Sequence, residues 1–390
     1  MPEKYDVIVV GLGAFGAATL CHLAGRGGKV LGIDRYNPPH TFGSTHGETR
    51  ITRFACGEGA DYTQFVRRSH ALWREYEEQS AAPLVVQNGL LVISGPGPRA
   101  LAHGKENFLD ETFGIARQNG IAHEALDEAA LRARFPALNI GPDERAYFEP
   151  GAGYVSPEAA IEVQLRIARQ AGAAIHTDET VERFDPRTGA VEVVTDRGTY
   201  TADKLVIAAG PWVPQFVPAL APRLTVRRQV LAWFRIDETK LSPEHYRPER
   251  FPVFVWQVPR EKTMYAFPWT GDGTPSVKVG TEQYHSASTA DTIDRTVGGD
   301  EIAALYRDYV AAFLPGLSGD CVRSAACPYT CTEDSHFIID RLPDDPRVTV
   351  VSACSGHGFK HSPAIGEAIA ELTTQGHTGH VSLEAFRLPR

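Results

Sequence analysis

The feature that most constrains this chain is a glycine-rich turn between a strand and a helix. Residues 5–10 form an apolar run of strand length, and the sequence GLGAFG follows directly at 11–16. An alanine- and leucine-rich stretch to about residue 24 predicts a helix, and KVLGID at 29–34 predicts a second strand that ends in an acid. A strand, a GxGxxG turn, a helix, a strand and an acid in this register predict a dinucleotide-binding unit.

Each part of this fingerprint has a physical role. Gly11 permits the tight turn, Gly13 lets the backbone approach a pyrophosphate, and Gly16 allows helix and strand to pack closely. The N-terminus of the helix offers free N–H groups and a positive dipole end to phosphate oxygens. Asp34 is expected to accept hydrogen bonds from the adenosine ribose. The fingerprint does not distinguish FAD from NAD, and a tight turn without a ligand is the alternative, so function must be inferred from other residues.

The composition is that of a soluble globular protein and excludes several classes of function. Of the 390 residues, 43% are hydrophobic and 22% are charged, which is sufficient for two domains with sizeable cores. The formal net charge of -9 argues against nucleic acid or an anionic membrane as the main partner. The apolar runs have the length of strands, and the first four residues are too polar for a signal peptide, so we expect a cytoplasmic protein.

The cysteines do not indicate a metal site. The six cysteines show neither a disulfide framework nor a CxxC pair. Three of them lie close in sequence to a histidine: Cys321, Cys327, Cys331 and His336. Their spacing fits no common zinc site, and we therefore expect no bound metal.

The order of predicted elements indicates an α/β (α+β) fold with two domains. A strand at 204–209 and a strand, glycine turn and helix from 348 onward repeat the theme of the first residues, so distant segments should share one sheet. The expected Rossmann-like domain is discontinuous and consists of residues 1–85, 150–215 and 325–390. Alternating or β-branched stretches between 225 and 281 predict an antiparallel sheet. The expected β-rich substrate domain consists of residues 86–149 and 216–324.

A loop after the second strand concentrates basic side chains. It reads GSTHGETRITR over residues 43–53. On a helix, Arg50 and Arg53 would share one face and present two guanidinium groups to an anion. The alternative is a solvated basic turn in which the arginines pair with Glu48 and Glu58.

Four further residues are candidates for a functional role, although each also has an ordinary structural explanation. Lys360 follows the turn SGHGF at the N-terminal end of the last predicted helix, where its charge opposes the helix dipole unless an anion lies nearby. Lys278 lies in a short apolar strand, whose inner face disfavours an unpaired cation. By default Tyr265 is a core aromatic residue and Cys327 a small buried hydrophobic one. None of the four decides the function alone.

Taken together, these motifs resemble the monomeric sarcosine oxidase and N-methyltryptophan oxidase family of flavoenzymes, within the D-amino acid oxidase-like superfamily. The resemblance extends from about residue 5 to about residue 380. Its most specific matches are rare motifs in the same order, namely PPH at 38–40, the loop 43–53, AAGPW at 208–212, CPYT at 327–330, HFIID at 336–340 and SGHGFK at 355–360.

The resemblance implies an FAD cofactor that is bonded through its 8α carbon to the sulfur of Cys327. A covalent bond retains the flavin and raises its potential. The last helix, from about residue 361, should direct its N-terminus at the flavin pyrimidine and stabilise negative charge there as the ring is reduced. The residues implied in cofactor binding are Gly11, Gly13, Gly16, Asp34, Ser44, Thr45, Val181, Gly210, Cys327, Gly356, Gly358 and Lys360.

The resemblance also implies oxidation of a secondary-amine amino acid by a monomer whose partners are the small-molecule amine and O2. Arg53 and Lys360 would bind the substrate carboxylate, and a hydride would pass to flavin N5. The imine would hydrolyse, and O2 would be reduced to H2O2. The residues implied around the reacting atoms are Arg50, His46, Tyr265, Lys278 and Tyr329. Among them Lys278 would promote oxygen reduction, because a fixed cation lowers the cost of superoxide-like charge.

Glu282 departs from the family pattern, which usually has a histidine four residues after the lysine matched by Lys278. A carboxylate there would bind a cationic or hydroxylated substrate tail, or pair with a neighbouring base. The substrate is therefore open between an N-methyl amino acid, such as sarcosine or N-methyltryptophan, and a cyclic or glycated one of pipecolate, proline or fructosyl type. Trp256 and Trp269 either form an aromatic wall for a larger side chain or belong to the core.

Three other functions remain as rivals. A flavin dehydrogenase of the same fold would pass its electrons to a different acceptor. An NAD enzyme is disfavoured by the late glycine turn and by Cys327. A non-catalytic flavoprotein would bind the cofactor without turning over any amine.

Overall fold

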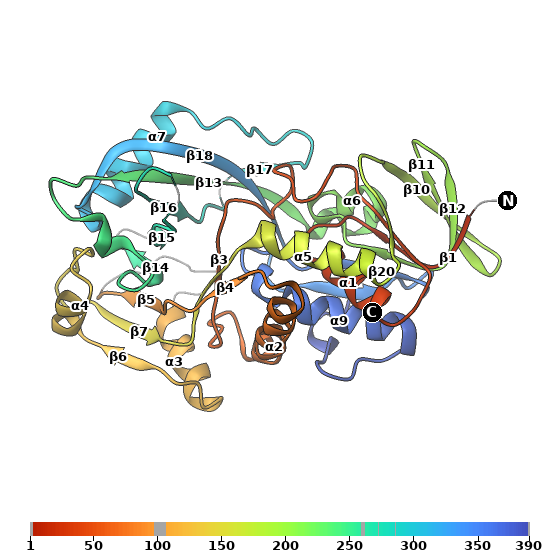
Figure 1. Ribbon diagram of the computed structural model, residues 1–390, viewed down its shortest axis with the longest axis horizontal. Coiled ribbons are helices and arrows are strands. Elements are labelled where there is room, and N and C mark those ends of the chain that lie inside the picture. Colours follow the sequence, from red (N-terminus) through yellow and green to blue (C-terminus); the bar gives the residue numbers. More distant parts are fainter. Residues whose placement is uncertain (1–2, 97–106, 259–261, 272, 285, 389–390) are drawn as a thin grey trace.

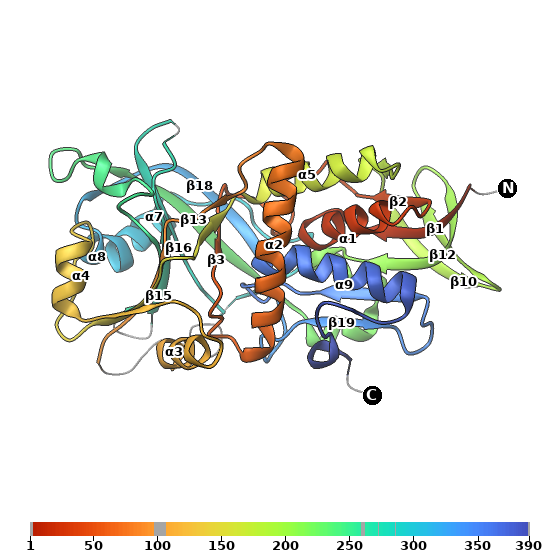
Figure 2. The ribbon, with the colours of Figure 1, turned by 60° about the horizontal axis from the view of Figure 1, so that its bottom comes forward.

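The computed structural model describes residues 3–96, 107–258, 262–271, 273–284 and 286–388. Two large sheets lie toward opposite ends of its long axis, and a small sheet with the long helix α2 (Thr63–Ser80) lies between them (Figures 1 and 2). Within the described ranges, no helix combines the length and apolar character needed to cross a lipid bilayer.

The first sheet carries the glycine fingerprint and has eight strands in the part of the chain that is described. Its main path consists of β10 (Val181–Arg187), β11 (Ala190–Thr195), β12 (Thr199–Ile207), β1 (Glu3–Val10), β2 (Val30–Ile33) and β9 (Ala174–His176). Two late strands, β20 (Val348–Ser352) and β19 (Ile338–Arg341), extend it beside β12. β1 pairs in parallel with β12 and β2, which places Val9 opposite Val206 and Gly32. The first, middle and last parts of the chain thus share one sheet, as the repeated sequence pattern predicted.

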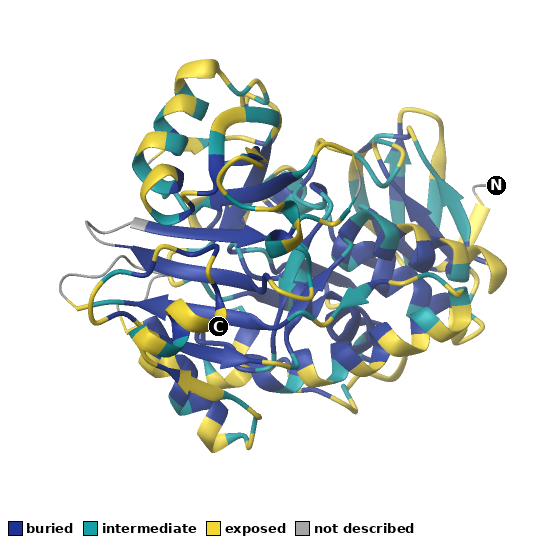
Figure 3. Ribbon diagram, turned by 60° about the vertical axis from the view of Figure 1, so that its left-hand side comes forward, coloured by how far each residue is buried: buried dark blue, intermediate teal, exposed yellow. Residues whose placement is uncertain are grey.

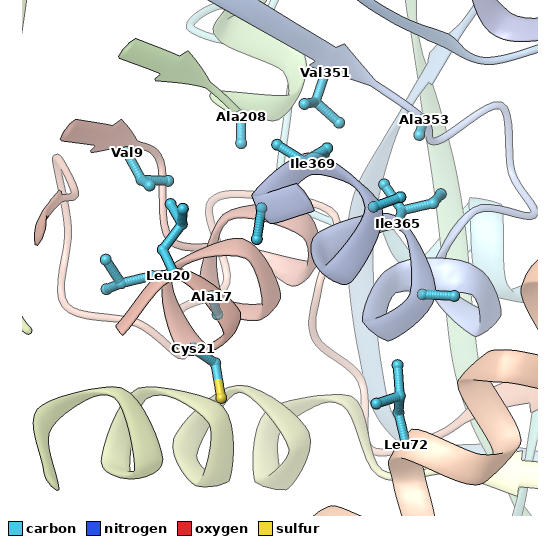
Figure 4. Packing of buried hydrophobic residues seen from close by; sticks show 14 of the residues in the cluster. Val9, Ala17, Leu20, Cys21, Leu72, Ala208, Val351, Ala353, Ile365 and Ile369 are labelled. Carbon is cyan, nitrogen blue, oxygen red and sulfur yellow. The ribbon is translucent and has the colours of Figure 1, made fainter. Parts of the chain in front are cut away.

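Helices cover the face of this sheet that β1 and β20 share. α1 (Ala14–Gly25) packs on α9 (Ser362–Gln375) and on α5 (Pro157–Gln170). Figure 4 shows Cys21 of α1 directed at the neighbouring helix, with Ile365 and Ile369 of α9 below Val351 of β20 and Ala208, which directly follows β12. α1 is enclosed on nearly all sides, and apolar residues therefore lie on almost every face of this helix. Its packing against the sheet and the two helices holds its N-terminus at the end of β1.

The second sheet is mostly antiparallel and has nine strands among the described residues. They are β17 (Ala287–Ser288), β13 (Thr225–Ile236), β16 (Ser276–Thr281), β15 (Lys262–Phe267), β14 (Val253–Val258), β5 (Leu90–Ser94), β7 (Arg145–Glu149), β6 (Glu124–Leu126) and β18 (Leu317–Cys331). β14 and β5 are the parallel pair. The long strand β18 runs along β13, with Cys327 opposite Gln229, and continues toward the first sheet (Figure 1).

The small central sheet consists of β3 (Arg50–Thr52), β8 (Gly153–Val155) and β4 (Val85–Val86). Buried residues follow the strands of both large sheets, while exposed positions lie mainly on the outer faces of helices and on loops (Figure 3). Trp256 is fully buried in the core of the second sheet, and Trp269 packs against that core. The interpretation as a core residue is therefore confirmed for Trp256, whereas Trp269 is only partly buried. The residue bounds of the two domains stay a prediction.

Candidate active site

One cavity is lined by residues of both large sheets and of the small sheet between them. Its nucleotide end is lined by Gly11, Gly13, Asp34, Val181 and Gly210. Its distal end is lined by Arg50, Arg53, Tyr265, Glu282, Cys327, Tyr329 and Lys360. Gly356 and Gly358, in the turn after β20, also contribute. The cavity therefore collects most of the residues that the sequence singled out.

The three glycines of the fingerprint have different structural reasons: two are required by close packing, and one leaves its backbone open to the cavity. A Cβ at Gly11, whose φ is +86°, would lie 2.6 Å from the Ala208 carbonyl oxygen, and one at Gly16 would lie 1.7 Å from the Gly11 oxygen. A Cβ at Gly13 would meet only the Thr45 hydroxyl, at 3.9 Å. Gly11 and Gly16 are thus required by close packing, whereas Gly13 leaves its backbone open to the cavity at the start of α1. A phosphate group fits against such an open helix N-terminus.

Asp34 is held rigidly at the wall of the nucleotide end. One of its carboxylate oxygens accepts a hydrogen bond from the Leu12 N–H at 2.6 Å, and the other accepts one from the Tyr36 N–H at 2.8 Å. The side chain is buried at the end of β2. A carboxylate has about four lone-pair sites, so two backbone bonds leave capacity for ribose hydroxyls. An open glycine backbone, a helix N-terminus and this fixed acid together suit a dinucleotide.

Residues 50–52 of the loop form strand β3 and Arg53 follows it directly, so the expected helical face shared by the two arginines is wrong. β3 pairs with β8, with Arg50 opposite Val155, and this ladder excludes a helix there. The alternative of a solvated turn is wrong because Arg53 is only 2% exposed, but the pairing with Glu58 that it predicted is confirmed for Arg53. Glu48 pairs with Arg323 and accepts a hydrogen bond from Trp233 rather than from either arginine.

Arg53 belongs to a buried group with Glu58 and Lys360. Its Nη2 donates to the Glu58 carboxylate at 2.6 Å, and the Lys360 ammonium donates to the same oxygen at 3.1 Å. Lys360 also donates to the His357 carbonyl at 2.8 Å. The Arg53 Nε is buried without a hydrogen-bond partner. Two buried cations thus share one carboxylate beside the cavity, an arrangement that favours a further anion.

The pKa values of these two cations shift in opposite directions. Burial lowers the pKa of Lys360, and Glu58 only partly opposes the effect. Burial also disfavours the charge of Arg53, but the Glu58 carboxylate outweighs it and raises the pKa of Arg53. We take both side chains as cationic at neutral pH, since an arginine does not lose its proton in proteins and Lys360 donates to two oxygens.

Lys278 and His46 lie near the distal end but are not among the residues that line the cavity. The Lys278 ammonium donates to the Gly47 and Thr49 carbonyls at 2.7 and 2.8 Å and lies 3.9 Å from the centroid of the Phe267 ring. Burial, followed by Arg50, moves its pKa well below the ordinary value. Burial, Arg50 and Lys278 lower the pKa of His46 to about 3, so this imidazole is neutral.

Cys327 lies on β18 where the cavity passes between the two sheets. Its side chain is 1% exposed, and its sulfur lies 3.8 Å from Arg50 Nη2 and 3.7 Å from the Ser44 carbonyl oxygen. The Ser44 hydroxyl donates to the Pro328 carbonyl at 2.7 Å and so ties the 43–53 loop to this strand. Burial raises the pKa of the Cys327 thiol to about 11, with Arg50 opposing it. The arginine is therefore the group placed to stabilise a thiolate.

Two tyrosines and Glu282 complete the distal end. The hydroxyls of Tyr265 and Tyr329 lie 3.5 Å apart, and burial raises the pKa of both. Tyr265 lies over Gly280 of the neighbouring strand, where a Cβ would come within 2.4 Å of the ring. Glu282 follows β16 directly and accepts a hydrogen bond from the Tyr284 hydroxyl at 3.3 Å.

Several lining residues were missed from the sequence. Glu179 lines the nucleotide end and accepts a hydrogen bond from the Thr195 hydroxyl at 2.6 Å. Trp212 and His357 also line the cavity. Glu58 was expected only as a partner of the arginines, and its contact with Lys360 was not foreseen. No local signal marks Glu179, whereas Trp212 and His357 stand inside motifs that were recognised for other residues.

Comparisons with known proteins show which family the chain resembles over its length. The profile of the family described as FAD dependent oxidoreductase matches residues 6–372. The chain is 37% identical to a monomeric sarcosine oxidase of Streptomyces avermitilis, over 97% of this chain and 96% of the relative. It is 35% identical to an N-methyl-L-tryptophan oxidase of Yersinia pestis, over 99% of both chains.

Solved structures show the same fold at lower identity. NikD, an unusual amino acid oxidase essential for nikkomycin biosynthesis, superposes in its open form with a TM-score of 0.84 at 23% identity, over 99% of this chain and 97% of that chain. L-proline dehydrogenase from P. horikoshii superposes with a TM-score of 0.78 at 22% identity, over 97% and 95%. These likenesses concern the fold alone.

Proposed function

This chain belongs to the family of FAD-dependent oxidoreductases, and on that premise we propose that it oxidises the carbon–nitrogen bond of an N-alkyl amino acid, with O2 as acceptor and H2O2 as product. The observation that carries the proposal is the buried pair of cations, Arg53 and Lys360, at the distal end of a cavity whose other end suits a dinucleotide. Relatives named sarcosine oxidase and N-methyl-L-tryptophan oxidase, at 35–37% identity, support the same substrate class.

The residues that would hold FAD are those of the nucleotide end. Gly13 and the N-terminus of α1 would bind the pyrophosphate, and Asp34 would bind the ribose. Cys327 would form the thioether to the 8α carbon, with Arg50 stabilising its thiolate during attachment. When bound, FAD supplies a hydride acceptor for the substrate and a means of passing electrons to oxygen.

Arg53 and Lys360 would bind and orient the substrate carboxylate. Both point their nitrogen atoms at Glu58, so a bound carboxylate completes a cluster of two cations and two anions. Charge-assisted contacts of this kind orient a ligand strongly because they are short and directional. Tyr265 and Tyr329, neutral at physiological pH, would close the wall beside the amine and exclude water.

The same cations would help the substrate amine lose its proton. A secondary ammonium has a reference pKa of roughly 10, similar to that of lysine. Burial and nearby positive charge disfavour its cationic form, so the bound amine becomes neutral and its lone pair becomes available. Lys360 itself shows this effect, since burial lowers its pKa in this pocket.

Lys278 and Arg50 would serve the oxygen half of the reaction. Lys278 donates to two backbone carbonyls, and Arg50 to the Ser44 and Thr49 carbonyls, so both side chains are fixed in position; Arg50 carries a permanent charge, whereas burial disfavours that of Lys278. A fixed cation stabilises the negative charge that develops when oxygen is reduced. We further propose that the protein acts as a cytoplasmic monomer.

Oxygen uptake and peroxide formation with N-methyl amino acids test this function. We expect Arg53→Gln and Lys360→Met each to raise the KM for the amino acid at least 10-fold, because a charge-assisted contact contributes about 1.5–3 kcal/mol. The corresponding N-methyl amine without a carboxylate is the control, and its KM should not change.

The same assay distinguishes the alternatives. Reduction of an artificial dye without oxygen uptake would indicate a dehydrogenase in place of an oxidase. Turnover of pipecolate, proline or a glycated amino acid alone would move the substrate class to cyclic or glycated amines. Unchanged KM values in both variants would show that Arg53 and Lys360 do not bind the substrate carboxylate.

A further inference from the structure

We propose that residues 289–295 form a strap that closes the nucleotide end over a bound dinucleotide, and that Asp291 is its positioning residue. The strap belongs to the part of the chain that forms the second sheet, because it lies between β17, which pairs with β13, and α7 (Gly299–Leu305). Admission and retention of FAD lie outside the proposed function and do not depend on which amine is oxidised.

Asp291 contacts three side chains that line the nucleotide end. Its carboxylate oxygens accept hydrogen bonds from the Trp212 indole N–H at 2.8 Å and from the Gln215 amide at 2.7 Å. The Arg35 guanidinium donates to the same carboxylate at 3.1 Å. These three partners line the cavity, whereas Asp291 is not among the lining residues. Asp291 therefore acts on a cofactor through the side chains that it holds.

The partners of Asp291 come from two separate segments of the first sheet. Arg35 follows β2 and stands next to Asp34, the expected ribose ligand, while Trp212 and Gln215 follow β12. β1, whose end carries the glycine turn, lies between these two strands and parallel to both. A dinucleotide lies in the crevice outside the carboxyl ends of such strands. By joining the two segments, Asp291 spans this crevice.

A second contact of the strap holds the loop that follows β2. Arg295 Nη2 donates to the Phe42 carbonyl at 2.8 Å, and its guanidinium lies 5.5 Å from the centroid of the Phe42 ring. The Phe42 ring stacks on the ring of Tyr36, with 4.2 Å between centroids, and Tyr36 lines the cavity. The strap therefore fixes the wall of the nucleotide end at two places, through Asp291 and through Arg295.

The base of the strap is held more firmly than its contacts across the crevice. Ile293 is buried, and Arg228 of β13 donates to the Asp294 carbonyl. By contrast, the side chains of Arg35 and Asp291 are 45% and 47% exposed. Ion pairs between exposed side chains are weak, because water and salt screen them. The contacts across the crevice can therefore break to admit FAD and form again behind it, while the base stays in place.

Release of FAD tests the strap without requiring turnover. The measurement uses the holoprotein of Cys327→Ala, so that the proposed thioether cannot mask release, and follows the rise in FAD fluorescence after dilution. In this background Asp291→Ala should release FAD at least about 5-fold faster, because three hydrogen bonds to its carboxylate are lost. Asp294→Ala is the matched control, since its carboxylate accepts from the Thr296 N–H within the same stretch. It should keep the rate of the parent protein.

Two further readouts distinguish positioning from a general loss of stability. Trp212→Phe keeps an aromatic ring at the cavity wall but removes the N–H that donates to Asp291. Its effect on release should be much smaller once residue 291 is alanine, so the two changes should be less than additive. ADP carries the adenosine and the pyrophosphate without the flavin. Its dissociation constant for the FAD-free protein should also rise at least about 5-fold in Asp291→Ala, because the strap closes over this half.

The outcomes separate the strap from the proposed function. Release at the parent rate in Asp291→Ala, additive effects with Trp212→Phe, or equal acceleration by Asp294→Ala would each overturn the role of Asp291. If Cys327→Ala purifies without FAD, the comparison rests on ADP, whose affinity must then fall in Asp291→Ala and not in Asp294→Ala. Failure of every secondary amine to reduce the flavin would refute the proposed function and leave these release rates and affinities unaffected.

Discussion

The two ends of the cavity are built by different means. The nucleotide end uses backbone atoms and one short-range acid: Gly13 opens the start of α1, and Asp34 is bonded to Leu12 and Tyr36. The distal end uses charged side chains of distant segments, such as Lys360 and Glu58, which are 302 residues apart. The first end is stabilised by the geometry of one βαβ unit, whereas the second depends on buried charges that must compensate one another.

This difference predicts where each end is vulnerable. Changes at the nucleotide end should affect retention of the cofactor. Changes at the distal end should alter substrate affinity, attachment of the flavin or pH dependence while the cofactor stays bound. Cys327 belongs to the distal end but would bond the cofactor that the nucleotide end holds, so it provides the sharpest test of the comparison.

The largest effect is expected for Cys327→Ala. The proposed thioether cannot form, so acid-precipitated protein should lose all yellow colour from its pellet. Because the nucleotide end is intact in this variant, the native protein should still purify with FAD bound non-covalently. The measurement is flavin absorbance in the pellet and in the supernatant.

Cys354→Ala is the control, since Cys354 lines the same cavity and should leave the attachment unaffected. A pellet of Cys327→Ala that stayed yellow would show that another residue carries the bond. Loss of all flavin from the native variant would instead mean that the nucleotide end cannot hold the cofactor alone, and the contrast between the two ends would then weaken.

A smaller effect is expected from pH on the stability of the folded protein. It should arise from a histidine near the distal end of the cavity. His70 contacts the Thr52 hydroxyl at 2.8 Å beside β3, and burial, followed by Arg74, lowers its pKa to about 4. The unfolded chain binds a proton near pH 6.5 while the folded protein does not. Stability is therefore complete above about pH 6.5 and falls as the pH drops toward 4, by about 3 kcal/mol from this group.

His70→Gln should flatten this dependence. In thermal unfolding of the holoenzyme between pH 7 and pH 4, the variant should lose less stability than the wild type by about that amount. A parallel loss in both proteins would mean that His70 is already protonated in the folded state. His46, whose pKa is about 3, should contribute in the same sense and remain in the variant.

Much of the fold and of the nucleotide end could be predicted from the sequence, because their signals are local. The GxGxxG turn, the acid at residue 34 and the strand periodicities each act over fewer than about 25 residues. The packing of Gly16 against the Gly11 oxygen in the structure is the contact that the turn requires. The strand predicted at 204–209 corresponds to the second half of β12, which begins earlier, at Thr199.

The distal end was less predictable because tertiary pairing overrides local pattern. Arg50 and Arg53 have helical spacing, but pairing of β3 with β8 makes the segment a strand. Nothing near residue 58 in the sequence reveals that Glu58 will contact Lys360, and the displacement of Lys278 from the cavity wall depends on the Gly47 and Thr49 carbonyls. The roles of these residues at the site stay predictions.

The most direct test of the central claim is anaerobic mixing of the holoenzyme with single secondary amines, followed by the visible flavin spectrum. The amines are sarcosine, N-methyltryptophan, pipecolate, proline and a glycated amino acid. We expect at least one α-carboxylated secondary amine to bleach the flavin, and admission of air to restore the colour with release of H2O2. A flavin that stays fully oxidised with every one of these amines would contradict it.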